Sequence, residues 1–220
     1  MSKKPARRTA ERILEVCLSL FNRFGEPNVS TTLISAELRI SPGNLYYHYP
    51  SKEELINTLF LRYESKLNNL LLAGSEVKDV EDAWFFFNTL FQLIGQYSFL
   101  YRDLNNLLSN NRLLELHFQS ILSNKKIAIQ NLLESMQSSG AFGGNKTFPQ
   151  ATSTSMVVIL TYWLSYEYVR EPRTALESSK VEVAIQHGVS QALHLLMPHL
   201  EVQQREHLMA LISTYDPSSI

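Results

Sequence analysis

The chain has 220 residues, 45% of them hydrophobic, and can therefore bury a substantial core as one large domain or as a small domain joined to a larger one. The formal net charge is -1, but residues 1–66 carry ten Lys and Arg against seven Asp and Glu, whereas residues 67–220 carry ten against fourteen. This composition excludes disorder as the main state, and the single cysteine excludes an internal disulfide framework.

Neither secretion nor membrane insertion is expected. Glu15, Asn22 and Arg23 interrupt the apolar stretch that follows the positively charged start, which is unlike a signal peptide. The longest apolar runs, WFFF and MVVILTYWL, reach at most about half of the roughly 18 residues that a membrane span requires. We therefore expect a cytoplasmic protein that makes no contact with a membrane.

Apolar residues recur at three and four positions rather than alternating, which predicts an all-α fold. The first helix is expected over 7–24, ended by Gly25 and Pro27. Cys17 is expected to be a small core residue rather than a nucleophile, because apolar residues surround it at helical spacing. The expected buried side of this helix contains Ile13, Cys17, Leu20, Phe21 and Phe24.

Two short helices over 31–38 and 41–47 and a long helix over 51–72 are expected next. Ser41 is suited to the N-cap of the second short helix, with Pro42 at its first position. Ser51 and Glu54 are spaced as a capping box that opens the long helix. This order of helices predicts a helix-turn-helix unit, in which the second short helix enters the DNA major groove.

The leading end of that short helix has the residue types that base recognition needs. Pro42 and Gly43 are small enough for close approach to base edges, and Leu45 is expected to turn inward. Asn44 carries an amide that both donates and accepts hydrogen bonds, as bidentate recognition of adenine requires. We therefore expect Asn44 to read sequence.

Phosphate contacts are expected from the flanking residues. Aromatic side chains with polar tips combine packing with anchoring, and helix amino termini favour anions. The candidates are Thr31, Thr32, Tyr46, Tyr47, His48 and Lys52. A basic amino-terminal arm, which is a feature that many unrelated proteins share, would add Lys3, Lys4, Arg7, Arg8 and Arg12.

The stretch TTLISAELRISPGNLYYHYPSKEEL resembles the amino-terminal signature of TetR-like bacterial transcriptional regulators. The resemblance is close over about residues 9–60, and the remainder is similar only as a helical domain of the right length. It implies a homodimer that binds double-stranded, palindromic operator DNA, usually as a repressor, and is released by a small molecule in the carboxy-terminal domain. It places the DNA contacts on Thr31, Thr32, Ser41, Pro42, Gly43, Asn44, Tyr46, Tyr47, His48 and Lys52.

Two positions depart from this family pattern. Arg39 occupies a turn position that is usually glycine, so it is expected to have a positive φ angle. Asn44 stands where threonine is frequent, so a different operator sequence is expected.

Three parts of the chain are expected: a helix-turn-helix domain over 1–50, a connecting helix over 51–72, and a helical effector-binding and dimerisation domain over 73–220. The last should contain helices over 79–96, 98–109, 110–138, 149–170, 176–197 and 200–214.

A candidate effector cavity is built on the helix over 81–96, which is apolar on nearly all sides except for a line of amides at Asn88, Gln92 and Gln96. This line either faces water or supplies the polar groups of a cavity. Aromatic residues at helical spacing are more often plain core, but a cavity lined by them would favour an apolar or aromatic effector. The candidate lining residues are Trp84, Phe87, Asn88, Phe91, Gln92, Phe118, Tyr162 and Tyr166.

Helices 149–170 and 176–197 are the candidates for pairing two subunits. Gly188 in mid-helix costs about 1 kcal/mol against alanine, which suggests a packing reason for it. The ladder of small residues around Gly188 permits close approach either of a partner subunit or of a helix of the same subunit. The candidate interface residues are Val158, Ala184, Gly188, Gln191, Ala192 and Leu195.

No metal, cofactor or catalytic centre is expected. His187 and His194 lie seven residues apart, roughly 10 Å along a helix axis, which is too far for one ion, and no hydrolase or metalloprotease motif appears. The predicted function is therefore that of a sequence-specific repressor released by a small effector. The alternatives are a helical protein-interaction module and an all-helical enzyme acting on a hydrophobic substrate.

Overall fold

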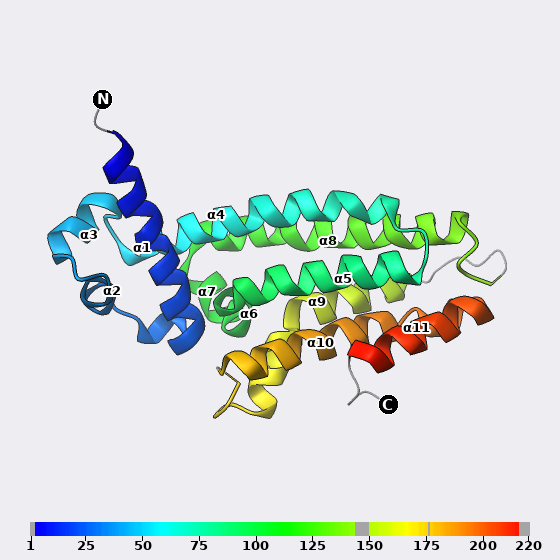
Figure 1. Ribbon diagram of the computed structural model, residues 1–220. Helices are drawn as coiled ribbons and strands as arrows, with labels where there is room; N and C mark the ends of the chain where they lie inside the picture. The colour runs from blue at the N-terminus through cyan, green and yellow to red at the C-terminus, as the bar shows by residue number, and fades with distance from the viewer. Residues whose placement is uncertain (1–2, 144–149, 176, 216–220) are drawn as a thin grey trace.

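The computed structural model (Figure 1) describes residues 3–143, 150–175 and 177–215, and the fold is all-α as expected. Short 3-10 turns, η1 (Glu26–Asn28), η2 (Leu72–Glu76) and η3 (Met197–His199), connect some of the helices. The helices are α1 (Lys3–Phe24), α2 (Thr31–Leu38), α3 (Pro42–His48), α4 (Lys52–Leu71), α5 (Val80–Gln96), α6 (Ser98–Arg102), α7 (Leu104–Asn110), α8 (Arg112–Ser138), α9 (Gln150–Arg170), α10 (Ser178–His194) and α11 (Val202–Tyr215).

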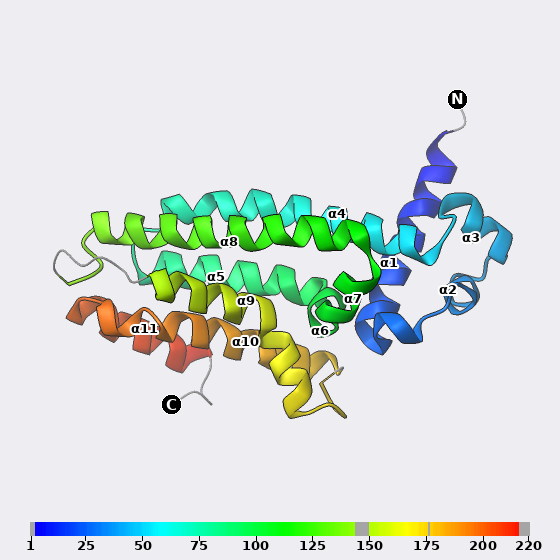
Figure 2. The same cartoon turned by 180° about the vertical axis from the view of Figure 1, so that it is seen from behind.

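Helices α1, α2 and α3 form a small unit at one end of the molecule (Figures 1 and 2). Helix α1 packs against α2 and α4, and α2 packs against α3. The core of this unit includes Ile13, Cys17 and Leu45, all fully buried, and burial raises the pKa of the Cys17 thiol to about 12. Cys17 is thus a core residue, as predicted.

The turn between α2 and α3 adopts the conformation expected from its sequence. Arg39 has φ 55° and ψ 43°, and it is the one non-glycine residue with positive φ in the described part of the chain. The Ser41 hydroxyl then accepts a hydrogen bond from the Asn44 backbone N–H at 3.2 Å and opens α3. The Ser51 hydroxyl opens α4 in the same way by accepting from the Glu54 N–H at 3.1 Å.

The remaining helices form an elongated bundle (Figure 1). Helix α4 leaves the small unit and runs beside α8 along the bundle, and Figure 2 shows the same pairing from behind. Helix α10 packs against α5 and α9, and α11 packs against α5 and α10. Arg62 of α4 holds Glu11 of α1 with two hydrogen bonds of 2.6 and 2.8 Å, so the long helix is anchored to the small unit as well as to the bundle.

Three local expectations are corrected. Helix α1 begins at Lys3 rather than at residue 7. Phe24 is 39% exposed rather than buried, because it is the last residue of α1. The single helix expected over 98–109 is divided into α6 and α7 at Asp103, because Ser165 of α9 donates its hydroxyl to the carbonyls of Tyr101 and Arg102 at 2.5 and 3.4 Å.

Candidate functional site

Helix α3 lies at the end of the molecule farthest from the bundle in both ribbon views (Figures 1 and 2). Its leading residues Pro42, Gly43 and Asn44 are exposed, whereas Leu45 is fully buried and fixes the helix on the small core. In both views no described helix lies in front of this exposed end, which leaves it accessible to a duplex. This placement is the one that the sequence predicts for a recognition helix.

The aromatic residues that follow Asn44 differ in their surroundings. Tyr47 is 80% exposed and Tyr46 is 47% exposed. The Tyr46 hydroxyl lies 3.0 Å from the Thr31 hydroxyl, which joins the beginning of α2 to α3. Tyr49 is buried, and it donates its hydroxyl to the Ala10 carbonyl at 3.4 Å, so it belongs to the core.

Lys52 is positioned differently from the expected free phosphate ligand. Its ammonium donates to the Glu26 carbonyl oxygen at 2.6 Å and forms an ion pair with the Glu26 carboxylate at 2.7 Å. These contacts tie the beginning of α4 to η1. Lys52 must therefore leave an existing partner before it binds a phosphate, whereas Thr32 is exposed at the beginning of α2.

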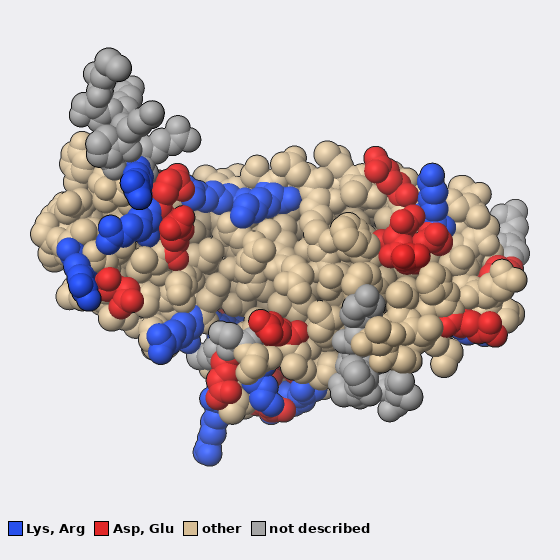
Figure 3. All heavy atoms as spheres, viewed as in Figure 1, with Lys and Arg blue, Asp and Glu red and all other residues tan. Residues whose placement is uncertain are grey.

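Basic residues outside the expected set also lie on this end of the molecule. Figure 3 shows Lys and Arg gathered over the small unit and the start of α4, with a few acidic groups among them, while Asp and Glu gather near the α4–α5 connection. Arg39 is exposed in the turn before α3, and it has a positive φ angle there. Arg12 is used structurally, because its guanidinium donates to the Leu38 carbonyl at the end of α2 at 2.9 Å.

The residues expected to line one effector cavity are separated in the structure. Phe87, Phe91 and Phe118 are at most 2% exposed and fill the core. Tyr162 and Tyr166 are 43% and 54% exposed on the outer side of α9. This helix carries apolar residues on its solvent-facing side as well as on its buried side. These two residues therefore do not line an interior cavity, which corrects the prediction.

The other three candidates lie in different surroundings. Trp84 lines an open groove between η2 and α5, and Gln92 lines another between α1, α5 and α10. Gln92 and Gln96 are exposed, so most of the amide line faces water. Asn88 is half-buried, and its side-chain oxygen is buried without a hydrogen-bond partner.

The ladder of small residues on α10 packs within its own subunit. Ala184, Gly188 and Ala192 are buried. A Cβ atom at Gly188 would lie 2.5 Å from a ring carbon of Phe91 and 2.7 Å from a ring carbon of Trp163. The ladder thus allows α10 to approach α5 and α9 closely. The prediction that it lies at a dimer interface is wrong.

An apolar stripe remains exposed along α9. Val158, Tyr162, Tyr166 and Val169 recur at four, four and three positions and are 51%, 43%, 54% and 77% exposed. A groove of about 320 Å³ borders the stripe between α8 and α9. Of the other expected interface residues, Gln191 is exposed and Leu195 is half-buried, so both stay predictions.

A buried lysine, which the sequence reasoning missed, lies where α6, α8 and α9 meet. Lys125 is fully buried and donates to the Tyr101 hydroxyl at 3.1 Å, the Leu160 carbonyl at 3.2 Å and the Thr161 hydroxyl at 3.4 Å. Tyr101 in turn shares a hydrogen bond with Tyr63 of α4. Burial lowers the pKa of Lys125 to about 7 and raises the pKa values of both tyrosines. Its regular spacing with Phe118, Ile121 and Ile129 on the buried face of α8 was the available sequence signal.

The described ranges contain neither a candidate metal site nor a candidate membrane span. No group of three or more His, Cys, Asp or Glu side chains is arranged to hold a metal ion there. No helix within those ranges is long and apolar enough to cross a membrane.

Comparisons with known proteins agree with this architecture. Residues 13–59 match the family model described as bacterial regulatory proteins of the tetR family, and residues 62–208 match a model described as a bacterial transcriptional repressor of the TetR type. A TetR-family transcriptional regulator from Marinobacter aquaeolei VT8 is 29% identical, with a TM-score of 0.79, over 94% of this chain and 98% of that one.

Two other similarities are more limited. The ketosteroid transcriptional regulator KstR2 of Mycobacterium tuberculosis shares the fold, with a TM-score of 0.59 and 17% identity over 88% of this chain and 95% of that one. The nucleoid occlusion factor SlmA of Glaesserella parasuis serovar 5 is 30% identical over 82 residues, which are 37% of this chain. That match spans 41% of the length of SlmA.

Proposed function

The chain belongs to the TetR family of bacterial transcriptional regulators, and from this premise we propose that it is a dimeric repressor released from a palindromic operator by a small effector. DNA-binding regulation is the function of the family, and membership does not favour an interaction module or an enzyme. The division into residues 1–50, 51–72 and 73–220 and a cytoplasmic location are parts of the same proposal.

The observation that carries the proposal is the exposed leading end of α3. A recognition helix must present short side chains to base edges while its other side is held by a core. Pro42, Gly43 and Asn44 meet the first requirement, and the fully buried Leu45 meets the second. Selection of bound duplexes from random DNA, at a stated salt concentration, tests the proposal. The expected product has two half-sites about one helical turn, 34 to 36 Å, apart.

An Asn44→Ala variant should bind the selected operator about 1 to 3 kcal/mol more weakly, because it loses an amide suited to one base edge. Binding to random DNA should change much less, since phosphate contacts dominate it. Fluorescence anisotropy with operator and random duplexes at matched salt measures both affinities.

Asn69→Ala is the matched control, because Asn69 is also an exposed helical asparagine but lies on α4. It should leave both affinities unchanged. Equal losses on operator and random DNA for Asn44→Ala would contradict a base-reading role.

Subunit pairing is proposed to use the exposed stripe on α9. The stripe is apolar and continuous along the helix, and two copies related by a twofold axis bring identical faces together. Helix α9 lies in the bundle, so pairing there leaves both α3 helices free (Figure 2). The proposed interface is therefore the outer side of α9 instead of the small-residue side of α10.

A Tyr162→Asp variant should weaken dimerisation by roughly 2 kcal/mol or more, because it places a charge in the middle of an apolar contact. Operator affinity should fall with it, since a monomer engages one half-site. Sedimentation equilibrium measures the dimer constant. Phe85→Asp is the control, because Phe85 is 66% exposed on α5 and lies outside the stripe; a comparable loss there would count against α9 as the interface.

A further inference from the structure

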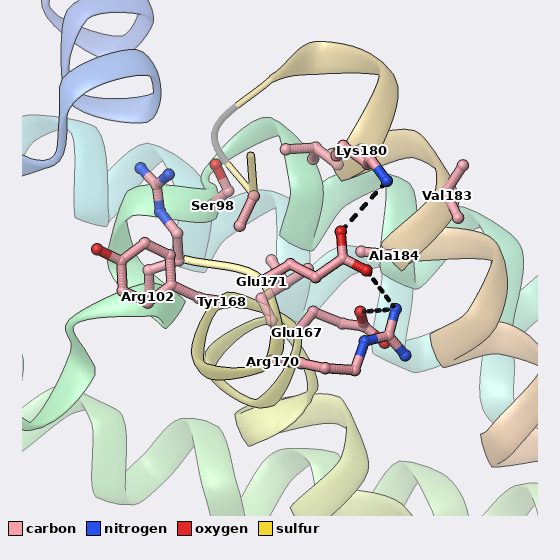
Figure 4. Close-up of a pocket in the computed structure, with 12 residues that line it drawn as sticks. Ser98, Arg102, Glu167, Tyr168, Arg170, Glu171, Lys180, Val183 and Ala184 are labelled. Carbon is pink, nitrogen blue, oxygen red and sulfur yellow. Dashed lines mark hydrogen bonds and ion pairs between the residues drawn. The ribbon is translucent and has the colours of Figure 1, made fainter. Parts of the chain in front are cut away.

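A small pocket lies between α6, the second half of α9 and the first half of α10 (Figure 4). Its volume is about 50 Å³, which limits an occupant to a small molecule. Leu164, Val181 and Ala184 form its apolar wall. Ser98 and Arg102 enter it from α6, the helix that follows α5.

The charged groups of this pocket are unequally matched. Its lining contains three cations, Arg102, Arg170 and Lys180, and two carboxylates, Glu167 and Glu171. Glu167 pairs with Arg170 at 2.8 Å and Glu171 pairs with Lys180 at 3.2 Å, and Figure 4 shows these contacts grouped away from Arg102. Arg102 is therefore the cation of the lining that has no carboxylate partner among the described residues.

Arg102 also holds the DNA-binding unit. One of its terminal nitrogens, Nη2, donates to the carbonyls of Phe21 and Asn22 at 3.2 and 2.6 Å, at the end of α1. The Asn22 side chain accepts from the Ser98 hydroxyl at 3.1 Å and from the Phe99 N–H at 3.0 Å. The beginning of α6 and the end of α1 are thus joined by a set of hydrogen bonds centred on Arg102 and Asn22.

The second terminal nitrogen of Arg102, Nη1, is buried and has no hydrogen-bond partner within the described residues. A buried donor without an acceptor is costly, and the cost is greater for a charged group. Burial accordingly lowers the pKa of Arg102. An acceptor that carries a negative charge would satisfy both the free N–H and the unmatched charge.

We infer that this pocket binds a small monocarboxylate, with its carboxylate on Nη1 of Arg102 and its short apolar chain on Leu164, Val181 and Ala184. This inference rests on the proposed function, because it assigns the effector site of the repressor. It replaces the expected aromatic effector, whose lining residues the structure separates.

The same contacts connect the ligand to DNA binding. A carboxylate at Nη1 attracts the same guanidinium whose Nη2 donates to the Phe21 and Asn22 carbonyls, and because charge-assisted hydrogen bonds are the stronger kind, binding draws the guanidinium toward the ligand. Ligand binding therefore loosens the attachment of α1. It favours an arrangement of the two α3 helices of the dimer that no longer fits the operator. By linkage, bound operator must weaken ligand binding by the same factor.

Isothermal titration calorimetry of the full chain tests the site with butyrate, butyramide and butylammonium at matched ionic strength. Butyrate should bind at least about tenfold more tightly than either analogue, because only it supplies the negative charge. Operator should weaken butyrate binding, and butyrate should weaken operator binding by an equal factor. Equal affinity for butyrate and butyramide, or no butyrate binding, would overturn the inference.

Variants separate the pocket from other anion sites. Arg102→Gln should reduce butyrate affinity at least about tenfold, and Arg173→Gln, at an exposed arginine outside the lining, should not. Because Arg102→Gln also disturbs the attachment of α1, Ala175→Leu is a second variant: it narrows the pocket, keeps Arg102, and should also abolish binding. Unchanged affinity in either pocket variant would sink the assignment.

The failures of the two proposals are distinguishable. Calorimetry with butyrate requires no DNA, and duplex selection requires no ligand. Operator selection without butyrate binding would leave the repressor standing and remove this site. Butyrate binding without operator selection would rule out the proposed repressor function, and the pocket could then not be its effector site.

Discussion

A Gly188→Leu variant should unfold with a free energy lower by about 3 kcal/mol or more, because α10 has no room for a side chain at this position. Even a Cβ atom would come within 2.8 Å of two ring carbons of Phe91 and 2.7 Å of Trp163. Both rings belong to other helices, α5 and α9. Phe91 is 1% exposed and the Trp163 indole N–H donates to the Ala184 carbonyl at 2.7 Å, so neither ring can swing aside freely. Urea denaturation at a fixed protein concentration measures the loss.

Gly43→Leu is the matched control for this prediction. An added Cβ at Gly43 has only the Ser41 hydroxyl oxygen near it, at 4.0 Å. The same substitution should therefore leave the free energy of unfolding nearly unchanged or slightly raise it. A similar stability for both variants would show that α10 does not pack as described.

The features predicted well from the sequence are those that neighbouring residues determine. Ser41 and Ser51 are local signals for helix starts, since a hydroxyl caps N–H groups only three positions away. Arg39 could be placed in the left-handed region because the family that this stretch resembles usually has glycine at this turn position. The exposed end of α3 and the buried Leu45 follow from the same short stretch, whereas the DNA contacts expected there stay predictions.

The features predicted poorly depend on contacts between distant segments. Helices that are apolar on several sides do not reveal which side meets the core, so Tyr162 was placed inside and Gly188 was placed at a partner surface. The attachment of Arg102 to Asn22 joins residues 80 positions apart, and no local pattern announces it. The ion pair of Lys52 with Glu26 likewise has no local sequence signal, because only the fold brings the two residues together.

The burial of Lys125 leads to the second large effect, which concerns pH. The unfolded chain keeps its lysine protonated up to a pKa near 10.5, whereas the folded protein releases this proton at a pKa of about 7. Between these values the unfolded state binds more protons, so the free energy of unfolding rises with pH. Below about pH 7 both states are protonated, and the charged ammonium destabilises the fold fully.

The expected rise between pH 7 and pH 9 is about 2 kcal/mol, from a slope that approaches 1.36 kcal/mol per pH unit. No carboxylate of the described residues pairs with Lys125; its neighbours are Tyr101, Thr161 and the Leu160 carbonyl. The tyrosines become important only above about pH 10, where their raised pKa values act in the opposite direction. Cys17 acts in the same opposing direction from about pH 8 upward, because its thiol has a pKa of 9.0 in the unfolded chain and about 12 in the fold. The contribution of the lysine is therefore the difference between the parent and a variant that lacks only Lys125.

A Lys125→Met variant should lose most of this rise, because methionine fills a similar volume without a titratable group. It should also be more stable than the parent at pH 7, since the buried charge is gone, although part of the gain is offset by lost hydrogen bonds. Lys126→Met, at the next position and only half-buried, is the matched control and should keep the parental slope. Urea denaturation at several pH values, at one protein concentration, compares the three proteins. A parental slope in Lys125→Met would mean that the ammonium is solvated, and that the contacts among α6, α8 and α9 differ from those described.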